Sequence, residues 1–200
     1  MAYISQIHSG SETYDIKAKA VEPQSDTSSA GDLPIFFGQQ QSTGSYDIRY
    51  NSSVSVRPST GVLMGAAWND YAEYRAYEGQ EPKPGRVVCE TGKDTVSLSQ
   101  ERLQAAPSVV SDTFGFVIGD KKNTVPVSVA GKVLVYPNED LNSYGVGDAF
   151  CSGPDGTVSK MSRQEIINYP DRILGYFVGI PEEDTFNGVA VNGRFWIKVV

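Results

Sequence analysis

Histidine and cysteine are nearly absent from this chain of 200 residues, which has one His and two Cys. A catalytic triad built on histidine has only His8 to use, and His8 lies in a segment with the pattern of a surface hairpin. Zinc sites need Cys and His at short spacings, and no CxxC or HxxxH pair is present. Neither a G-x-S-x-G elbow nor a phosphate-binding glycine loop occurs. We therefore expect no metal, no cofactor and no histidine-based catalysis.

Basic residues and long apolar runs are also scarce. The chain has 17 Lys and Arg against 24 Asp and Glu, a net charge of −7. Nucleic-acid binding needs clustered Lys and Arg, so we expect no nucleic-acid partner. No apolar run reaches the roughly 18–20 residues of a membrane span. The first residues lack the basic and apolar regions of a signal peptide, so we expect synthesis in the cytoplasm and no membrane insertion.

Glycine, proline and tyrosine are plentiful instead. The chain has 20 Gly, 11 Pro and 11 Tyr, with 40% hydrophobic and 20% charged residues. Strong helix formers are sparse, and the length is sufficient to bury a real core. This profile is typical of a globular protein that is mainly β.

An internal repeat spans residues 80–200. Three groups recur 62 residues later: Gly85, Cys89 and residues 95–97 return as Gly147, Cys151 and residues 157–159. Residues 127–131 also match residues 189–193 at this spacing, and residues 115–119 match residues 175–179 at a spacing of 60. A fixed period predicts a duplicated structural unit. We expect a duplicated β-barrel-like domain with copies 80–137 and 142–200, related by an approximate two-fold, with Gly131 and Gly193 at equivalent turns.

The two cysteines occupy matching places in the repeat. Cytoplasmic synthesis favours two buried thiols in matching strands over a disulfide. A symmetric disulfide remains the alternative, because the sequence does not fix the distance between the two Cα atoms.

The first 79 residues divide into three parts. Residues 1–20 alternate around a Ser-Gly turn and predict a hairpin. Residues 21–34 are rich in Ser, Pro and Gly and predict a linker. Residues 35–79 form a connecting β-segment, in which residues 46–50 and 54–56 alternate as strands. A short buried strand is expected over 33–37, and the spacing of Trp68, Tyr71 and Tyr74 permits one helical turn.

Each copy of the repeat predicts the same series of elements. Strands are expected over 86–90, 95–98, 115–119 and 127–136, and over 148–152, 157–160, 175–179 and 189–199. Short helices are expected over 99–104 and 163–168, the second with Ser162 as its N-cap.

Two groups of residues are candidates for chemistry. Asp70 and Glu73 form a carboxylate pair suited to metal binding or acid–base work, although a solvated pair beside Arg75 is the commoner arrangement. Ser111 and Asp112 precede a strand, where they form either a turn entry or a self-cleavage junction next to a carboxylate.

Several motifs resemble those of virion proteins. These are WNDYAEY at 68–74, PGRVV at 84–88, VSDTFG at 110–115 and VNGRFWIKV at 191–199. Together they resemble C-terminal modules of tail- and head-fibre (appendage) proteins from phages and prophages of Gram-positive bacteria. The first residues, MAYISQI with TYDIK at 13–17, look like the start of such proteins.

The resemblance implies a structural role. The chain would be a fibre or appendage subunit of the virion, attached to other virion proteins through its N-terminal hairpin. Its outer domain would contact a host-surface glycan or protein. Fibres of this kind usually trimerise, so a homotrimer is expected. Residues 35–75 are short and rich in aromatics, and a three-chain bundle would bury Phe36, Phe37, Tyr46 and Tyr50. The alternative is that these side chains pack on the C-terminal domain of their own chain.

Two alternatives stay open. One is a capsid-decorating cement protein. The other is a self-cleaving chaperone, because some of these modules are similar to the peptidase G2 domain of phage pre-neck appendages, which cuts itself off after assembly. In that case residues 70–73 would be the opening motif of the domain, and cleavage would fall between Ser111 and Asp112.

Overall fold

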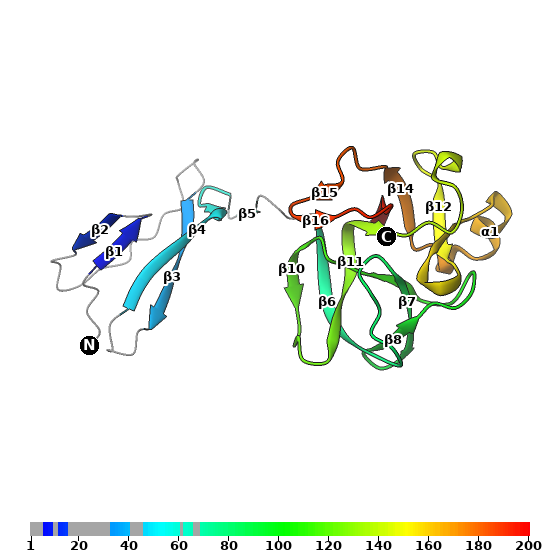
Figure 1. The fold of residues 1–200 in the computed structure, drawn as a ribbon, viewed down its shortest axis with the longest axis horizontal. Coiled ribbons are helices and arrows are strands. Elements are labelled where there is room, and N and C mark those ends of the chain that lie inside the picture. Colours follow the sequence, from blue (N-terminus) through cyan, green and yellow to red (C-terminus); the bar gives the residue numbers. More distant parts are fainter. Residues whose placement is uncertain (1–5, 10–11, 16–32, 41–45, 61, 66–68) are drawn as a thin grey trace. The chain divides into compact units, whose positions relative to one another are not determined.

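The chain forms two compact units, residues 1–66 and 67–200. The computed structural model describes residues 6–9, 12–15, 33–40, 46–60, 62–65 and 69–200 (Figure 1). The fold is mainly β, with 49% strand and 10% helix, which confirms the predicted class.

The first unit is a five-stranded sheet. β1 (Gln6–Ser9) and β2 (Glu12–Asp15) form an antiparallel hairpin, and β1 also pairs with β4 (Tyr46–Arg57). β3 (Leu33–Gln40) and β5 (Val62–Gly65) both pair with β4. Residues 46–57 are thus one strand instead of the predicted two, and Leu33 is 40% exposed instead of buried. Linker residues 21–32 and loop residues 41–45 lie outside the described part of the chain.

The second unit begins with a closed five-stranded barrel. Its strands are β6 (Asp70–Tyr77), β8 (Thr95–Leu98), β7 (Val87–Gly92), β9 (Pro107–Val110) and β11 (Thr124–Val135), and β11 returns to β6. β10 (Phe114–Ile118) lies parallel to β6 outside this ring. The helical turn permitted by the aromatic spacing of 68–74 is absent from residues 69–74, because Asp70 to Tyr74 pair as part of β6.

A second ring repeats this strand order. The far half of β11 pairs with β17 (Phe195–Val199), followed by β14 (Gly175–Gly179), β12 (Ala149–Ser152) and β13 (Val158–Lys160). A parallel bridge between Pro137 and Val158 closes the ring. The equivalence holds in detail, because Cys89 faces Ser97 as Cys151 faces Ser159. The predicted duplication therefore agrees with the observed strand pairing.

The register corrects part of the predicted alignment. β14 pairs with β12 and β17 as β9 pairs with β7 and β11, so the counterpart of β14 is β9 and not β10. Likewise, Val127 faces Glu73 and Val110, whereas Ile197 faces Val133 and Phe177. Ile197 is thus the counterpart of Val127, and the predicted matches of 115–119 and 127–131 are wrong.

Gly131 and Gly193 are consequently not equivalent. Gly131 lies inside β11, opposite Asp70 and Val199, where the strand passes from one ring to the other. Gly193 lies in the turn before β17. The two copies share β11, and β6 belongs to the first copy, so the duplicated domain starts about ten residues before the predicted boundary at 80.

The remaining elements are short. α1 (Arg163–Asn168) begins after Ser162, the predicted N-cap, and the structure adds a capping box between Ser162 and Glu165. The other pieces are η1 (Leu141–Ser143), η2 (Pro154–Gly156), η3 (Pro170–Arg172) and a hairpin of β15 (Thr185–Phe186) with β16 (Val189–Ala190).

The helix predicted for 99–104 is replaced by turns. Its polar groups bond to the second copy instead of forming a helix: Ser99 Oγ donates to the Gly153 carbonyl at 2.6 Å, and the Gln104 N–H donates to Ser152 Oγ at 2.8 Å. Docking between the copies thus overrides the local helical tendency.

An aromatic core fills the second ring. Phe150, Phe177 and Phe195 pack with Tyr144, and the ring centroids lie 4.9–6.5 Å apart. Val87 and Val109 of the first copy belong to the same cluster, so the core crosses the junction. Cys89 and Cys151 are buried free thiols, and burial raises the pKa of Cys89 to about 11.

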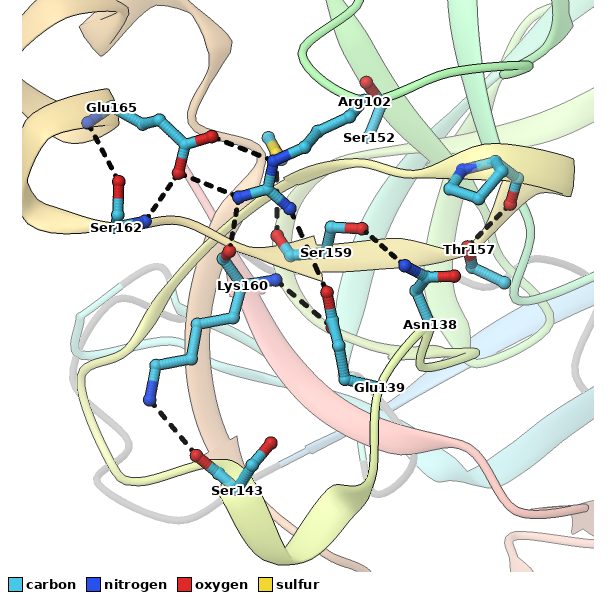
Figure 2. A network of polar contacts seen from close by, with 12 residues as sticks. Arg102, Asn138, Glu139, Ser143, Ser152, Thr157, Ser159, Lys160, Ser162 and Glu165 are labelled. Atoms are coloured by element: carbon cyan, nitrogen blue, oxygen red, sulfur yellow. Dashed lines mark hydrogen bonds and ion pairs between the residues drawn. The ribbon is translucent and has the colours of Figure 1, made fainter.

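Arg102 ties the loop after β8 to the second copy (Figure 2). Its guanidinium donates to both carboxylate oxygens of Glu165, at 2.9 and 2.8 Å, and to the Lys160 carbonyl at 2.6 Å. Glu139 Oε1 lies 3.9 Å from Arg102 Nη1, on the other side of the guanidinium. Arg102 therefore connects the start of α1, strand β13 and the loop that follows β11.

We expect this contact to make stability depend on pH. Hydrogen bonds from Arg102 and from the Ser162 backbone lower the pKa of Glu165 from 4.5 to about 2. The ionised Glu165 carboxylate therefore makes its full contribution to the free energy of unfolding above pH 4.5, and this contribution is lost as the pH falls towards 2. Arg102→Met should lower the free energy of unfolding at pH 7 by about 2 kcal/mol, the scale of charge-assisted hydrogen bonds. The same variant should remove much of the loss between pH 4.5 and 2.

Urea unfolding across this pH range measures both effects. Arg163→Met is the matched control, because it removes the same charge from an exposed position on α1. Equal acid sensitivity in the wild type and Arg102→Met would contradict the assignment.

Candidate functional site

Asp70 and Ser111, two of the predicted site residues, meet in a buried cluster at the start of β6. Ser111 Oγ donates to Asp70 Oδ1 at 3.1 Å, and Thr113 Oγ1 donates to the same oxygen at 3.1 Å. The Thr113 N–H donates to Ser111 Oγ at 3.1 Å, which closes a small turn. The start of β6 and the link between β9 and β10 bring these groups together. Both candidate motifs thus contribute to one cluster, although 41 positions separate Asp70 from Ser111.

Burial controls the electrostatics of this cluster. Asp70 is 6% exposed, and desolvation raises the pKa of its carboxyl group. The hydroxyls of Ser111 and Thr113 oppose this by stabilising the carboxylate. Asp70 Oδ2 is buried without a hydrogen-bond partner among the described residues. A carboxyl of raised pKa bonded to a serine hydroxyl has the elements of an activated nucleophile.

Asp112 faces away from this cluster. Its Oδ1 lies 2.8 Å from Arg194 Nη1, and the Arg194 side chain is only 3% exposed. Arg194 Nε also donates to the Val191 carbonyl at 3.0 Å. The ion pair therefore fixes Asp112 of the first copy to the turn before β17 in the second copy. Asp112 and Arg194 line a surface hollow together with Lys83 and Tyr136.

Glu73 does not join Asp70. Tyr71 donates a hydrogen bond to Glu73 Oε1 at 3.4 Å, and Arg75 Nη1 lies 3.7 Å from Oε2. Because successive residues of a strand point to opposite faces, positions three apart point away from each other. The carboxylate pair predicted from helical spacing is therefore not formed.

The described residues also contain no group of side chains suited to metal binding. Within them, no three His, Cys, Asp or Glu side chains gather to hold a metal ion. None of their helices combines the length and apolar character needed to cross a bilayer.

Sequence reasoning missed three members of the site. Thr113 donates a hydrogen bond to Asp70, and Ser128 lies next to the same carboxyl group. Arg194 forms the ion pair with Asp112. Arg194 has a visible signal, since it is a charged residue directly before the apolar residues 195–197. Ser128 has none, because a serine in a strand usually faces solvent.

Comparison with known proteins gives no relative. No family model, no curated protein and no solved structure matches the chain.

Proposed function

We propose that this protein is a structural subunit of a phage virion, exposed as a head or tail fibre or appendage. The division of the chain carries the proposal: a small β-sheet unit precedes a double barrel whose two rings share one strand and one core cluster that crosses the junction. In this proposal the N-terminal unit attaches to other virion proteins. The double barrel faces outward, towards a glycan or protein of the host surface.

A homotrimer is part of the proposal. β6 belongs to the barrel, so the three-chain contact is assigned to strands β3 and β4. The structure describes the backbone of Phe36, Phe37, Tyr46 and Tyr50 there, and their side chains lie outside what it describes. Burial of each such side chain stabilises an assembly by roughly 1.5–3 kcal/mol.

Two measurements test this function. Labelling of purified particles with an antibody against residues 69–200 should mark protruding fibres. Signal spread evenly over the capsid would identify a cement protein instead. Light scattering should give three chains of 21.7 kDa, and a stable single chain at micromolar concentration would contradict the trimer.

One observation favours a second function, self-cleavage between Ser111 and Asp112. The Ser111 hydroxyl donates to the Asp70 carboxylate, which places a candidate general base for a water molecule next to this bond. Three features oppose reaction: Ser111 is 1% exposed, Arg194 holds Asp112, and strands β9 and β10 flank the bond. Hydrolysis needs water at the bond, and cutting there would split the first barrel.

We therefore expect the purified chain to stay intact over days of incubation. Mass spectrometry should show one species near 21.7 kDa. Arg194→Met is the strongest challenge, because it releases Asp112. Asp171 lies before β14 and is not the counterpart of Asp112, but Pro170 and not a serine precedes it, so it is a control for cleavage at any aspartate. Fragments that end at Ser111 and start at Asp112, and that disappear in Asp112→Ala, would establish the chaperone function instead.

A further inference from the structure

One strand of the double barrel has an open edge. Ring closure gives nine strands of the ten-stranded sheet in residues 69–200 neighbours on both sides. β10 is the exception, because it pairs with β6 and with no strand beyond it (Figure 1). Closed barrels normally remove such edges, which are templates for pairing with another chain.

The β10 edge carries none of the usual protective side chains. Residues 114–119 contain no charge and no proline, two of the features that normally protect an edge strand. Phe116 is 50% exposed and Ile118 is 44% exposed, and alternation places both on one face. Tyr71 stacks on Phe116 at a centroid distance of 5.6 Å, so the apolar surface continues onto β6.

We propose that β10 pairs antiparallel with β10 of a second copy of this chain, around a two-fold axis at Val117. The strand is irregular between Phe114 and Phe116, so the regular part is centred on this residue. In this register Phe116 lies opposite Ile118 of the second copy, and the pair occurs twice. Aromatic and β-branched residues are favourable cross-strand partners.

The sequence of the edge favours a second copy over another partner. Phe116 and Ile118 are the two exposed apolar residues of the regular part, and a two-fold axis at Val117 brings each opposite the other. Gly115 and Gly119 flank this apolar pair on both sides. One sequence thus supplies both halves of the contact, as an isologous interface requires. The contact goes beyond the proposed fibre function and does not depend on it.

Sedimentation of the full chain tests this pairing. Such an interface is below the standard size and therefore weak, so measurements should extend to hundreds of micromolar. A two-fold contact joins at least two copies of whatever assembly the N-terminal unit forms. The wild-type mass at high concentration should therefore be at least twice that of Phe116→Lys, which places a charge on the edge.

Tyr176→Lys is the matched control. Tyr176 is an exposed aromatic residue of β14, but β14 has neighbours on both sides. At high concentration, Tyr176→Lys should have the same mass as the wild type. Equal masses for the wild type and Phe116→Lys would overturn the pairing. The mass of Phe116→Lys itself reports on the trimer, so the two proposals fail separately.

Cross-linking keeps the test decisive if Phe116→Lys misfolds. Val117→Cys places a thiol on the proposed axis, where mild oxidation should link two chains. Val178→Cys, in β14, is the control and should remain uncoupled although it is 38% exposed. The native cysteines are buried and should not compete. Equal coupling of both variants, or of neither, would overturn the proposal.

Discussion

Gly131→Ala should prevent folding of the double barrel or cost it roughly 3–6 kcal/mol. Gly131 has a φ of +114°, which side-chain-bearing residues rarely adopt. An added Cβ would lie 2.5 Å from the Asn69 carbonyl oxygen and 2.7 Å from the Asp70 Cα. Both atoms are backbone and cannot rotate away. A typical domain is stable by only about 5–15 kcal/mol, so this loss is a large share.

Gly193→Ala is the matched control. Gly193 also has a positive φ, +74°, but no atom lies within 4 Å of the added Cβ. Its cost should be about 1–2 kcal/mol, from the backbone conformation alone. Chemical denaturation of both variants gives the comparison. A cost for Gly131→Ala no larger than that for Gly193→Ala would contradict the close approach of β6 and β11.

Gly131 and Gly193 show which positions of the two copies the sequence repeat could match and which it could not. The sequence match placed the thiols correctly, because Cys89 and Cys151 lie in hairpins whose register depends on neighbouring residues. It failed at Gly131 and Gly193, because those positions depend on which distant strand each segment joins. Apolar residues and glycines recur in any β-strand, so spacing alone did not distinguish β9 from β10 as the partner of β14.

Local patterns had similar limits elsewhere. Ser162 and Glu165 form a capping box that needs only neighbouring residues, and α1 appeared where predicted. The loop of Arg102 failed as a helix because its polar groups bond across the junction between the copies. The contact between Asp70 and Ser111 was likewise hidden, because it depends on how distant segments of the chain meet. Chemistry at Ser111 was visible in the sequence only as an isolated Ser-Asp pair.

Phe150→Ala should lower the free energy of unfolding by about 3–5 kcal/mol, the usual cost of removing a buried aromatic side chain. Phe150 is fully buried and contacts the rings of Tyr144, Phe177 and Phe195. Phe116→Ala is the matched control, since that ring is 50% exposed and should cost about 1 kcal/mol at low protein concentration.

Phe150→Ala also tests whether the two copies unfold as one unit. β11 runs through both rings, and Val87 and Val109 share the cluster of Phe150, so the loss should spread to the first copy. Hydrogen exchange at the amides of Val88, Val96 and Val110 should report it, because protected amides in a cooperative unit open with the global free energy. Protection there should fall by the same amount as at Ile197 in the second copy. If protection falls in the second copy alone, the shared strand does not couple the barrels, and each copy unfolds independently.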